Sequence, residues 1–166
     1  MSESVYVKDL RKKIGHDLLL IPGVAAIIRD GRGRILLQRT KAGYWNLPAG
    51  AIDPGEKPAQ AIVREIFEET GLVARPVALI AVTGGAPEGR IEYDNGDVVE
   101  SATVIFACEA VGGKLKPQDD ETMKLEYFAV DEMPRLSAEY KREIFSIDGS
   151  NAYFEWDDSW LDRAKE

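Results

Sequence analysis

Cysteine and histidine are almost absent from this chain of 166 residues, which has one of each, Cys108 and His16. A single cysteine excludes an internal disulfide and suits a reducing compartment, so we expect a cytoplasmic protein. Cys108 lies in an apolar run, which predicts a buried structural thiol rather than a reactive one. His16 precedes the first strand run, and we expect a surface or core role for it.

Long apolar runs and an excess of positive charge are also missing. The run at 18–28 is interrupted by Pro22 and Gly23 and is too short to cross a bilayer, so we interpret it as a strand and expect no membrane partner. The formal net charge of −8 argues against non-specific binding to nucleic acid. It does not exclude a polyphosphate substrate, because a few basic residues and metal ions can set the local field.

The length fits one domain over 1–166, with a short N-terminal extension at 1–17 and an acidic, aromatic tail at 148–166 that we expect to dock in part. Periodicity predicts strands and helices, and polar, glycine-bearing stretches predict loops. The expected strands are 24–29, 34–39, 73–83, 98–110 and 125–130; the expected helices are 5–14, 58–70 and 137–147; the expected loops are 84–93 and 112–122. This interleaving favours an α/β fold, an α/β/α sandwich around a mixed β-sheet.

The most informative stretch is residues 50–72, which match the pattern G-x5-E-x7-R-E-U-x-E-E-x-G-U, where U is a bulky aliphatic residue. Pro58 suits the first turn of a helix, and Gly71 suits the position just after its C-terminus. Apolar residues recur between them at helical spacing. The segment 58–70 is therefore expected to be a helix packed on a core.

The acidic side chains of this helix point to a metal ion. Glu65, Glu68 and Glu69 share one face, where each like-charge pair costs about 0.2–0.5 kcal/mol and the helix dipole disfavours anions. A divalent cation reverses both effects, and carboxylate oxygens favour Mg²⁺, with Mn²⁺ as a substitute. A solvated acidic face is the alternative. The whole pattern would match by chance at about one in 10⁸ start positions, which favours the metal.

The pattern resembles a complete Nudix box, and the resemblance extends over about 20–147. It implies a loop–helix–loop in the Nudix-type sandwich, with Glu65, Glu68 and Glu69 as metal ligands. Catalytic roles are implied for Glu65, the candidate base, and for Glu68. They are also implied for Arg64, which would orient neighbouring glutamates, and for Glu56 as its partner.

The resemblance also implies a metal ligand just before the box. The backbone carbonyl of Ala49 occupies that place, although the family commonly has glycine there. The activity implied is Mg²⁺-dependent hydrolysis of a nucleoside diphosphate linked to another group, so the expected partner is a small-molecule nucleotide. A homodimer is an open alternative to a monomer.

Outside the box, the candidates are weaker. Arg39, Lys41 and Arg90 could contact phosphate or could be solvated strand and loop ends. A further acid from a downstream loop often completes the metal site in the family. Glu121 is our first choice for it, with Glu92 and Glu100 as competitors. An aromatic side chain, that of Trp45, could stack on a base or anchor the core.

Substrate choice rests on one residue. Pro87 stands fifteen positions after Leu72, a spacing associated in the family with ADP-ribose hydrolases, so ADP-ribose or an ADP-sugar is the leading expectation. House-cleaning of oxidised nucleoside triphosphates is an alternative that uses the same box. A non-catalytic nucleotide-sensing module is a third interpretation from another class.

Overall fold

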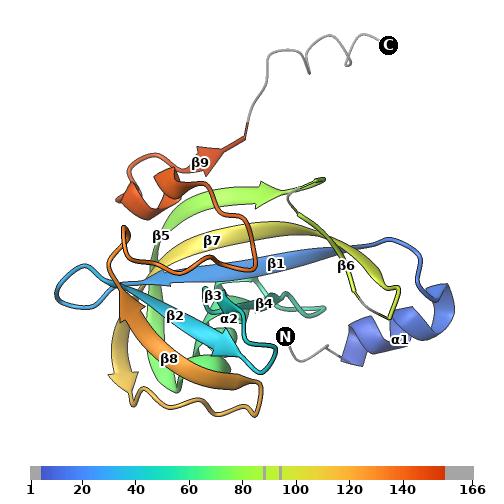
Figure 1. Cartoon of the computed structure of the whole chain (residues 1–166), viewed down its shortest axis with the longest axis horizontal. Helices are drawn as coiled ribbons and strands as arrows, with labels where there is room; N and C mark the ends of the chain where they lie inside the picture. The colour runs from blue at the N-terminus through green and yellow to red at the C-terminus, as the bar shows by residue number, and fades with distance from the viewer. Residues whose placement is uncertain (1–4, 88, 94, 156–166) are drawn as a thin grey trace, which may run out of the picture.

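The computed structural model describes residues 5–87, 89–93 and 95–155. Two helices, one 3₁₀ helix and nine strands are arranged as in Figure 1. In chain order they are α1 (Val5–Ile14), β1 (Leu19–Ile28), β2 (Ile35–Thr40), β3 (Trp45–Asn46), β4 (Ala49–Ala51), α2 (Pro58–Thr70), β5 (Leu72–Gly84), β6 (Arg90–Glu92), β7 (Val98–Gly113), β8 (Thr122–Phe128), η1 (Arg142–Ser146) and β9 (Tyr153–Phe154).

The strands form two sheets. The larger has the order β4-β1-β7-β5-β9, with β6 also paired to β7, and the smaller has the order β3-β2-β8. The larger sheet is mixed, because β7 pairs in parallel with β1 and antiparallel with β5. Each of the five strands expected from the sequence is present, and the prediction of a mixed α/β fold is confirmed.

The core lies in two clusters on opposite faces of the strands. Along β1, Val24, Ala26 and Ile28 belong to the cluster that packs on α2, which we call the α2-side cluster. Ala25 and Ile27 belong to the other, which includes residues of η1 and which we call the η1-side cluster. Because successive side chains of a strand point to opposite faces, one fully apolar strand serves both layers.

Two expectations differ from the structure. The helix expected at 137–147 is only the five-residue η1, because the preceding chain is held against β3: Leu136 forms a β-bridge to Trp45, and the Ser137 N–H donates to the Trp45 carbonyl at 2.9 Å. The loop expected at 84–93 contains the short strand β6, which pairs with the beginning of β7. In both places a tertiary contact decides the backbone, and local sequence cannot show it.

The N-terminal helix α1 has the bounds expected from the sequence and is fixed to the sheet by one arginine. Arg11, whose side chain is 10% exposed, donates to the carbonyls of Gly15 at 3.2 Å, Asp17 at 2.7 Å and Val98 at 2.8 Å. Its Nε also lies 3.7 Å from Asp97. The end of α1 is therefore joined to the start of β7, as the two lie side by side in Figure 1.

Part of the C-terminal tail docks, as expected. β9 pairs in parallel with β5, opposite Ala81 and Val82. Tyr153 packs against the η1-side cluster, whereas Phe154 is exposed. Trp156, the third aromatic residue of the tail, lies outside the described residues.

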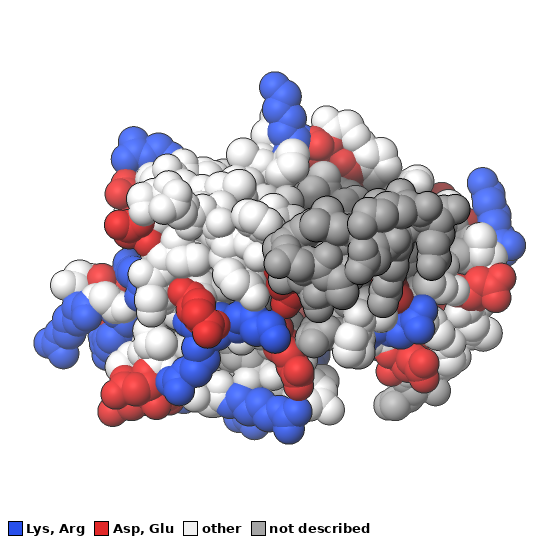
Figure 2. Space-filling view, turned by 90° about the horizontal axis from the view of Figure 1, so that it is seen from above, with Lys and Arg blue, Asp and Glu red and all other residues white. Residues whose placement is uncertain are grey.

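The charged surface is mixed rather than separated by sign. Figure 2 shows basic and acidic side chains next to each other on the described part of the face seen from above. Exposed ion pairs such as Arg75 with Glu109, at 2.9 Å, have this arrangement. No helix in the described ranges is both long and apolar enough to span a membrane.

Candidate active site

The helix of the 50–72 motif begins and ends where its sequence predicts. Pro58 is its first residue, and the preceding Lys57 N–H donates to the Gln60 side-chain carbonyl at 3.0 Å. Gly71 follows the last turn with a φ of +71°, in the left-handed region, and its N–H donates to the Phe67 carbonyl at 2.8 Å. Ala61, Ile62 and Ile66 are fully buried, so the helix is fixed on the core and its glutamates are held in a constant direction.

The loop between β7 and β8 caps the C-terminal end of α2. Backbone N–H groups of this loop donate to carbonyls of the last turn and of the cap residue, which have no partner inside the helix. The bonds run from Lys114 to Gly71 at 3.2 Å, from Lys116 to Thr70 at 2.9 Å, and from Gln118 and Asp119 to Glu68 at 2.8 and 3.0 Å. The turn that bears Glu68 and Glu69 is therefore anchored by main-chain groups.

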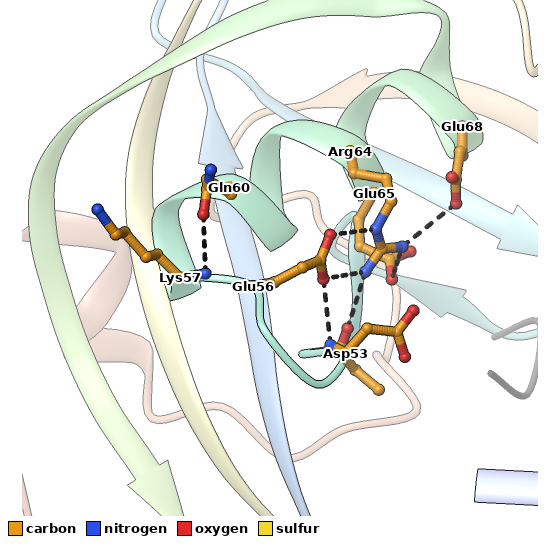
Figure 3. Close-up of polar contacts among 8 residues, drawn as sticks. Asp53, Glu56, Lys57, Gln60, Arg64, Glu65 and Glu68 are labelled. Carbon is orange, nitrogen blue, oxygen red and sulfur yellow. Dashed lines mark hydrogen bonds and ion pairs between the residues drawn. The ribbon is translucent and has the colours of Figure 1, made fainter. Parts of the chain in front are cut away.

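Arg64 is the centre of the polar network on this helix (Figure 3). Its guanidinium makes a two-bond contact with Glu56, at 2.8 and 2.9 Å, and donates to the Ala51 carbonyl at 3.0 Å. It also donates to Glu65 at 2.7 Å and lies 3.4 Å from Glu68. The hydrogen bonds that Arg64 donates to Glu56 and Glu65 raise its pKa, so it keeps its charge. The expected pairing with Glu56 is present.

Glu56 closes the loop that precedes the helix. Its carboxylate accepts both from Arg64 and from the Asp53 N–H at 3.1 Å, and the hydrogen bond from Arg64 lowers its pKa. At the other side of the loop, Gly50 lies directly against Glu65: a Cβ at position 50 would overlap the Glu65 carboxylate. Only glycine lets the backbone of β4 approach that side chain, which explains the first glycine of the motif.

Glu69 is the buried acid of the site, with an exposed fraction of 6%. Its carboxylate accepts from the Ala49 N–H at 2.8 Å, and the side-chain amide of Gln38 is a further donor group near it. Burial raises the pKa of Glu69 to about 8, against the effect of these two donors. Among the described residues, no lysine or arginine forms an ion pair with it. A buried carboxylate without a cationic partner is costly unless a cation joins it.

The donor set fits a divalent cation. Glu56, Glu65 and Glu68 share a single guanidinium, and Glu69 has no ion pair among the described residues, so acidic side chains outnumber the positive charge, and oxygen ligands are those that Mg²⁺ and Mn²⁺ prefer. Burial raises the pKa of Glu65, and Arg64 opposes that rise. Within the described ranges, no three acidic, histidine or cysteine side chains already converge on one point, because Glu65 and Glu68 both face Arg64. Glu65, Glu68 and Glu69 are the residues that could hold the ion.

The basic residues expected to contact phosphate are dispersed. Arg39 donates to the Gly43 carbonyl at 3.2 Å, and it lies on the face of β2 opposite Gln38 and Glu69. Lys41 pairs with Asp120 at 3.1 Å, and Arg90 pairs across the β6–β7 ladder with Glu100 at 2.9 Å. The structure therefore does not bring these three side chains together around α2.

The other candidates lie in separate parts of the structure. Glu121 is half-buried, its carbonyl accepts from the Lys41 N–H at 3.0 Å, and it immediately precedes Thr122 at the beginning of β8. Trp45 packs edge to face on Phe128, with ring centroids 5.0 Å apart, and belongs to the η1-side cluster. That packing matches the core-anchor interpretation of Trp45. Cys108 is buried, and burial raises its pKa to about 12, in agreement with an inert thiol.

Sequence reasoning missed Gln38 and Thr122. Both are buried, with exposed fractions of 4% and 7%, and the Thr122 hydroxyl donates to the Gln38 side-chain oxygen at 2.7 Å. One signal was available, since Gln38 is a polar residue directly after the apolar run at 35–37. Its place near Glu69 depends on how β2 packs beside α2, which no local pattern reveals.

Comparison with known proteins shows the family of the chain. The family model described as "NUDIX domain" matches residues 19–146. An ADP-ribose pyrophosphatase of Methanocaldococcus jannaschii is 31% identical over 145 residues, 82% of this chain and 78% of that protein. An RNA pyrophosphohydrolase of Teredinibacter turnerae is 44% identical over 66 residues, but the match covers only 39% of each chain.

Solved structures give the same result. A crystal structure of a UDP-X diphosphatase superposes with a TM-score of 0.65 at 26% identity, over 85% of this chain and 66% of that one. The MutT protein of Methanosarcina mazei superposes with a TM-score of 0.63 at 25% identity, over 78% of this chain and 93% of that one. Fold and site define a hydrolase that acts on pyrophosphate bonds. The chain belongs to the NUDIX domain family, and it is a Nudix pyrophosphohydrolase.

Proposed function

We propose that this enzyme uses Mg²⁺ to hydrolyse the pyrophosphate bond of a nucleoside diphosphate linked to another group, with ADP-ribose or an ADP-sugar as the substrate. The observation that supports the chemistry is the arrangement around Arg64. One guanidinium is shared by Glu56, Glu65 and Glu68, while the buried Glu69 has donors but no cationic partner in the described structure. The negative charge left over is what a divalent cation would neutralise.

Different residues of the chain have different roles in the proposed reaction. When bound, the cation supplies positive charge to the pyrophosphate oxygens and makes a nearby water more acidic. Glu65, Glu68 and Glu69 hold it, and the Ala49 carbonyl is a further proposed ligand. Arg64 fixes the directions of Glu65 and Glu68, and Glu56 fixes Arg64. Placement and charge account for most of the catalysis in such phosphoryl transfers.

A proton must leave the attacking water as its oxygen bonds to phosphorus and the bridging P–O bond breaks. Glu65 is the proposed acceptor, because its carboxylate is mostly buried and burial raises its pKa towards the value that a general base needs. The bridging oxygen leaves on the second phosphate. Glu121, at the end of the loop that caps α2, remains the proposed additional acid.

The substrate is supported by two independent observations. A relative that matches this chain over 78% of its own length is an ADP-ribose pyrophosphatase, and Pro87 has the spacing from the motif described above. Because the chain is partly similar to RNA pyrophosphohydrolases, RNA with a 5′-triphosphate is an alternative substrate that should be assayed as well. The lone buried cysteine fits the proposed cytoplasmic location.

The test is a hydrolysis screen with Mg²⁺ over ADP-ribose, an ADP-sugar, a dinucleoside polyphosphate, several (d)NTPs and a triphosphorylated RNA oligonucleotide, with identification of the products. We expect AMP and a sugar phosphate from the first two, at the highest kcat/KM. If a (d)NTP releases pyrophosphate with a higher kcat/KM than that for ADP-ribose, the house-cleaning function would be favoured instead. Binding of ADP-ribose without any hydrolysis in Mg²⁺ would instead indicate a sensor.

A further inference from the structure

The main chain of Glu121 is fixed on both sides. Its N–H donates to the Asp119 side chain at 3.2 Å, and its carbonyl accepts from the Lys41 N–H at 3.0 Å. The next residue, Thr122, donates its own N–H to the same Asp119 oxygen at 3.0 Å. Because β8 begins at Thr122, the Asp119 carboxylate helps to determine where this strand starts and where Glu121 lies just before it.

The backbone of Asp119 is bonded to the helix that bears the glutamates. Its N–H donates to the Glu68 carbonyl at 3.0 Å, and the preceding Gln118 N–H donates to the same carbonyl at 2.8 Å. One residue therefore joins the last turns of α2 to the start of β8. The backbone of Asp119 contacts the helix, and its side chain holds Glu121.

These bonds limit how far Glu121 can lie from Glu68. Asp119 and Glu121 are two residues apart in the chain, so their Cα atoms are at most about 7 Å from each other. The bond from the Asp119 N–H to the Glu68 carbonyl adds 3.0 Å. Two glutamate side chains that begin at this separation can reach one cation, provided that each carboxylate is turned towards it.

The loop does not need the Asp119 carboxylate in order to stay on the helix. Backbone N–H groups of Lys114, Lys116, Gln118 and Asp119 already bond the loop to the end of α2, and a substitution other than proline leaves these donors in place. The Asp119 side chain adds the two bonds to the main chain that follows it. Its contribution is therefore the placement of Glu121 rather than the attachment of the loop.

We propose that Asp119 is a positioning residue, whose carboxylate holds Glu121 in the place from which it acts on the cation bound by α2. The inference rests on the proposed function, because it takes Glu121 to be the additional acid of the metal site. Asp119 touches neither the cation nor the substrate in this assignment, and it works through its bond to the Glu121 N–H. Its loss should therefore reproduce part of the effect of losing Glu121.

Two measurements test the role: kcat and KM with Mg²⁺ for the best nucleotide of the screen, and Mn²⁺ binding to the substrate-free protein by electron paramagnetic resonance. We expect Asp119→Ala to lower kcat and Mn²⁺ affinity about tenfold each, as loss of an outer-shell hydrogen bond does, while KM changes less than about threefold.

Two replacements at the same position separate the acceptor from the charge. Asp119→Asn loses the charge but keeps an oxygen that accepts both N–H groups, so kcat and Mn²⁺ affinity should stay within about threefold of the parent. Asp119→Glu keeps the charge but moves the oxygens by one methylene, and it should behave like Asp119→Ala. The matched control is Asp120→Asn, which changes a side chain that is 92% exposed and should keep parental values.

A double-mutant cycle with Glu121→Gln separates positioning from a general loosening of the loop. If Asp119 acts through Glu121, Asp119→Ala should lower kcat and Mn²⁺ affinity by less than about twofold in the Glu121→Gln background. Loosening of the α2 turn would instead lower them by the same factor in both backgrounds. That second result, or parental kcat and Mn²⁺ binding in Asp119→Ala, would overturn the proposal.

Failure of the proposed function gives a different result. If the parent binds Mn²⁺ but hydrolyses no nucleotide of the screen, the proposed function fails, and the cycle measured by Mn²⁺ binding alone decides the role of Asp119. If the parent hydrolyses ADP-ribose and Glu121→Gln equals it in kcat and Mn²⁺ binding, the positioning role is refuted while the function stands. A parent that does not bind Mn²⁺ refutes both.

Discussion

Two arginines each gather several oxygen acceptors, yet the regions around them differ in charge. Arg11 bonds to the carbonyls of Gly15, Asp17 and Val98 and lies near one carboxylate, that of Asp97. Its positive charge is balanced locally, and the result is a joint between α1 and β7.

Arg64 has a similar number of contacts, but its acceptors are mostly carboxylates. Glu56, Glu65 and Glu68 share its single charge, and Glu69 lies buried beside them. The difference teaches that a dense hydrogen-bond network is not itself a sign of function. The excess of acidic groups around Arg64 is what indicates a functional site, because a purely structural contact does not require such an excess.

The largest difference between the Arg64 and Arg11 regions should appear when an acidic group is removed from the Arg64 region. We expect Glu69→Gln to fold normally and to lose at least about two orders of magnitude in kcat with Mg²⁺, because a ligand that stabilises developing charge is lost. Glu109→Gln, at an exposed ion pair with Arg75, is the matched control and should keep parental kcat. Equal turnover by Glu69→Gln and the parent would remove the basis for the metal site.

A smaller effect should follow from changing the geometry of Arg64 while keeping its charge. Arg64→Lys loses the two-bond contact with Glu56 and the bond to the Ala51 carbonyl. Because lysine cannot reproduce the planar fork, we expect kcat to fall about 10- to 100-fold. Steady-state kinetics measure kcat for this variant and for the control Arg75→Lys, which changes an exposed ion pair with Glu109. Parental kcat in Arg64→Lys would mean that charge alone suffices there.

The two regions should also respond to pH in opposite directions when metal is removed. Burial raises the pKa of Glu69 from 4.5 to about 8. Between these pH values the folded protein keeps the proton of Glu69, whereas the unfolded chain has released it. The free energy of unfolding therefore falls as the pH rises from about 4.5 to 8. The His16 contact lowers the pKa of Asp97, so its contribution is present above its unfolded value of 3.8 and is lost as pH falls through the folded value.

Denaturation in EDTA across pH checks this contrast. In the parent, the free energy of unfolding should fall between about pH 4.5 and 8 by an amount of the order of a few kcal/mol. In Glu69→Gln this fall should be absent or smaller. Added Mg²⁺ should partly restore the stability of the parent at pH 8. Asp97→Asn should change only the acid end of the profile. A parent profile that rises from pH 4.5 to 8 would contradict the charge imbalance around Glu69.

The smallest effect on activity should come from the Arg11 region. Arg11→Met keeps the aliphatic length but loses every donor, and we expect a fall of about 1 kcal/mol in the free energy of unfolding because the exposed Asp17 carbonyl and the part-buried Val98 carbonyl lose a hydrogen bond. The kcat with Mg²⁺ should stay within about twofold of the parent. Urea denaturation and kinetics on the same preparation measure both. A loss of activity as large as that of Arg64→Lys would erase the distinction between the two regions.

The sequence predicted best where local chemistry decides the backbone. Helix α2 has the expected bounds because Pro58 and Gly71, both within the local sequence, mark its two ends. The same holds for α1 and for the apolar strands of the larger sheet. The pairing of Arg64 with Glu56 was also foreseeable, because both belong to one continuous motif.

Prediction was weaker where distant segments meet. The helix expected at 137–147 gave way to η1 because Trp45 holds the preceding backbone in an extended form. Gln38 and Glu69, which lie near each other, belong to different elements, β2 and α2. Likewise, Arg39 follows Gln38 directly in sequence but faces the opposite layer. Such placements follow from strand alternation only after the packing is known.

The cap on α2 has a consequence for how this enzyme can change over time. The bonds from the 114–119 loop to the helix end are donated by backbone N–H groups, and Pro117, which has none, is not among the donors. At Lys114 and Lys116 any residue other than proline can therefore keep these bonds, whereas the side chain of Asp119 also accepts from the N–H groups of Glu121 and Thr122. The loop is free to acquire new substrate preferences while the catalytic turn stays where it is, so specificity and chemistry can evolve separately.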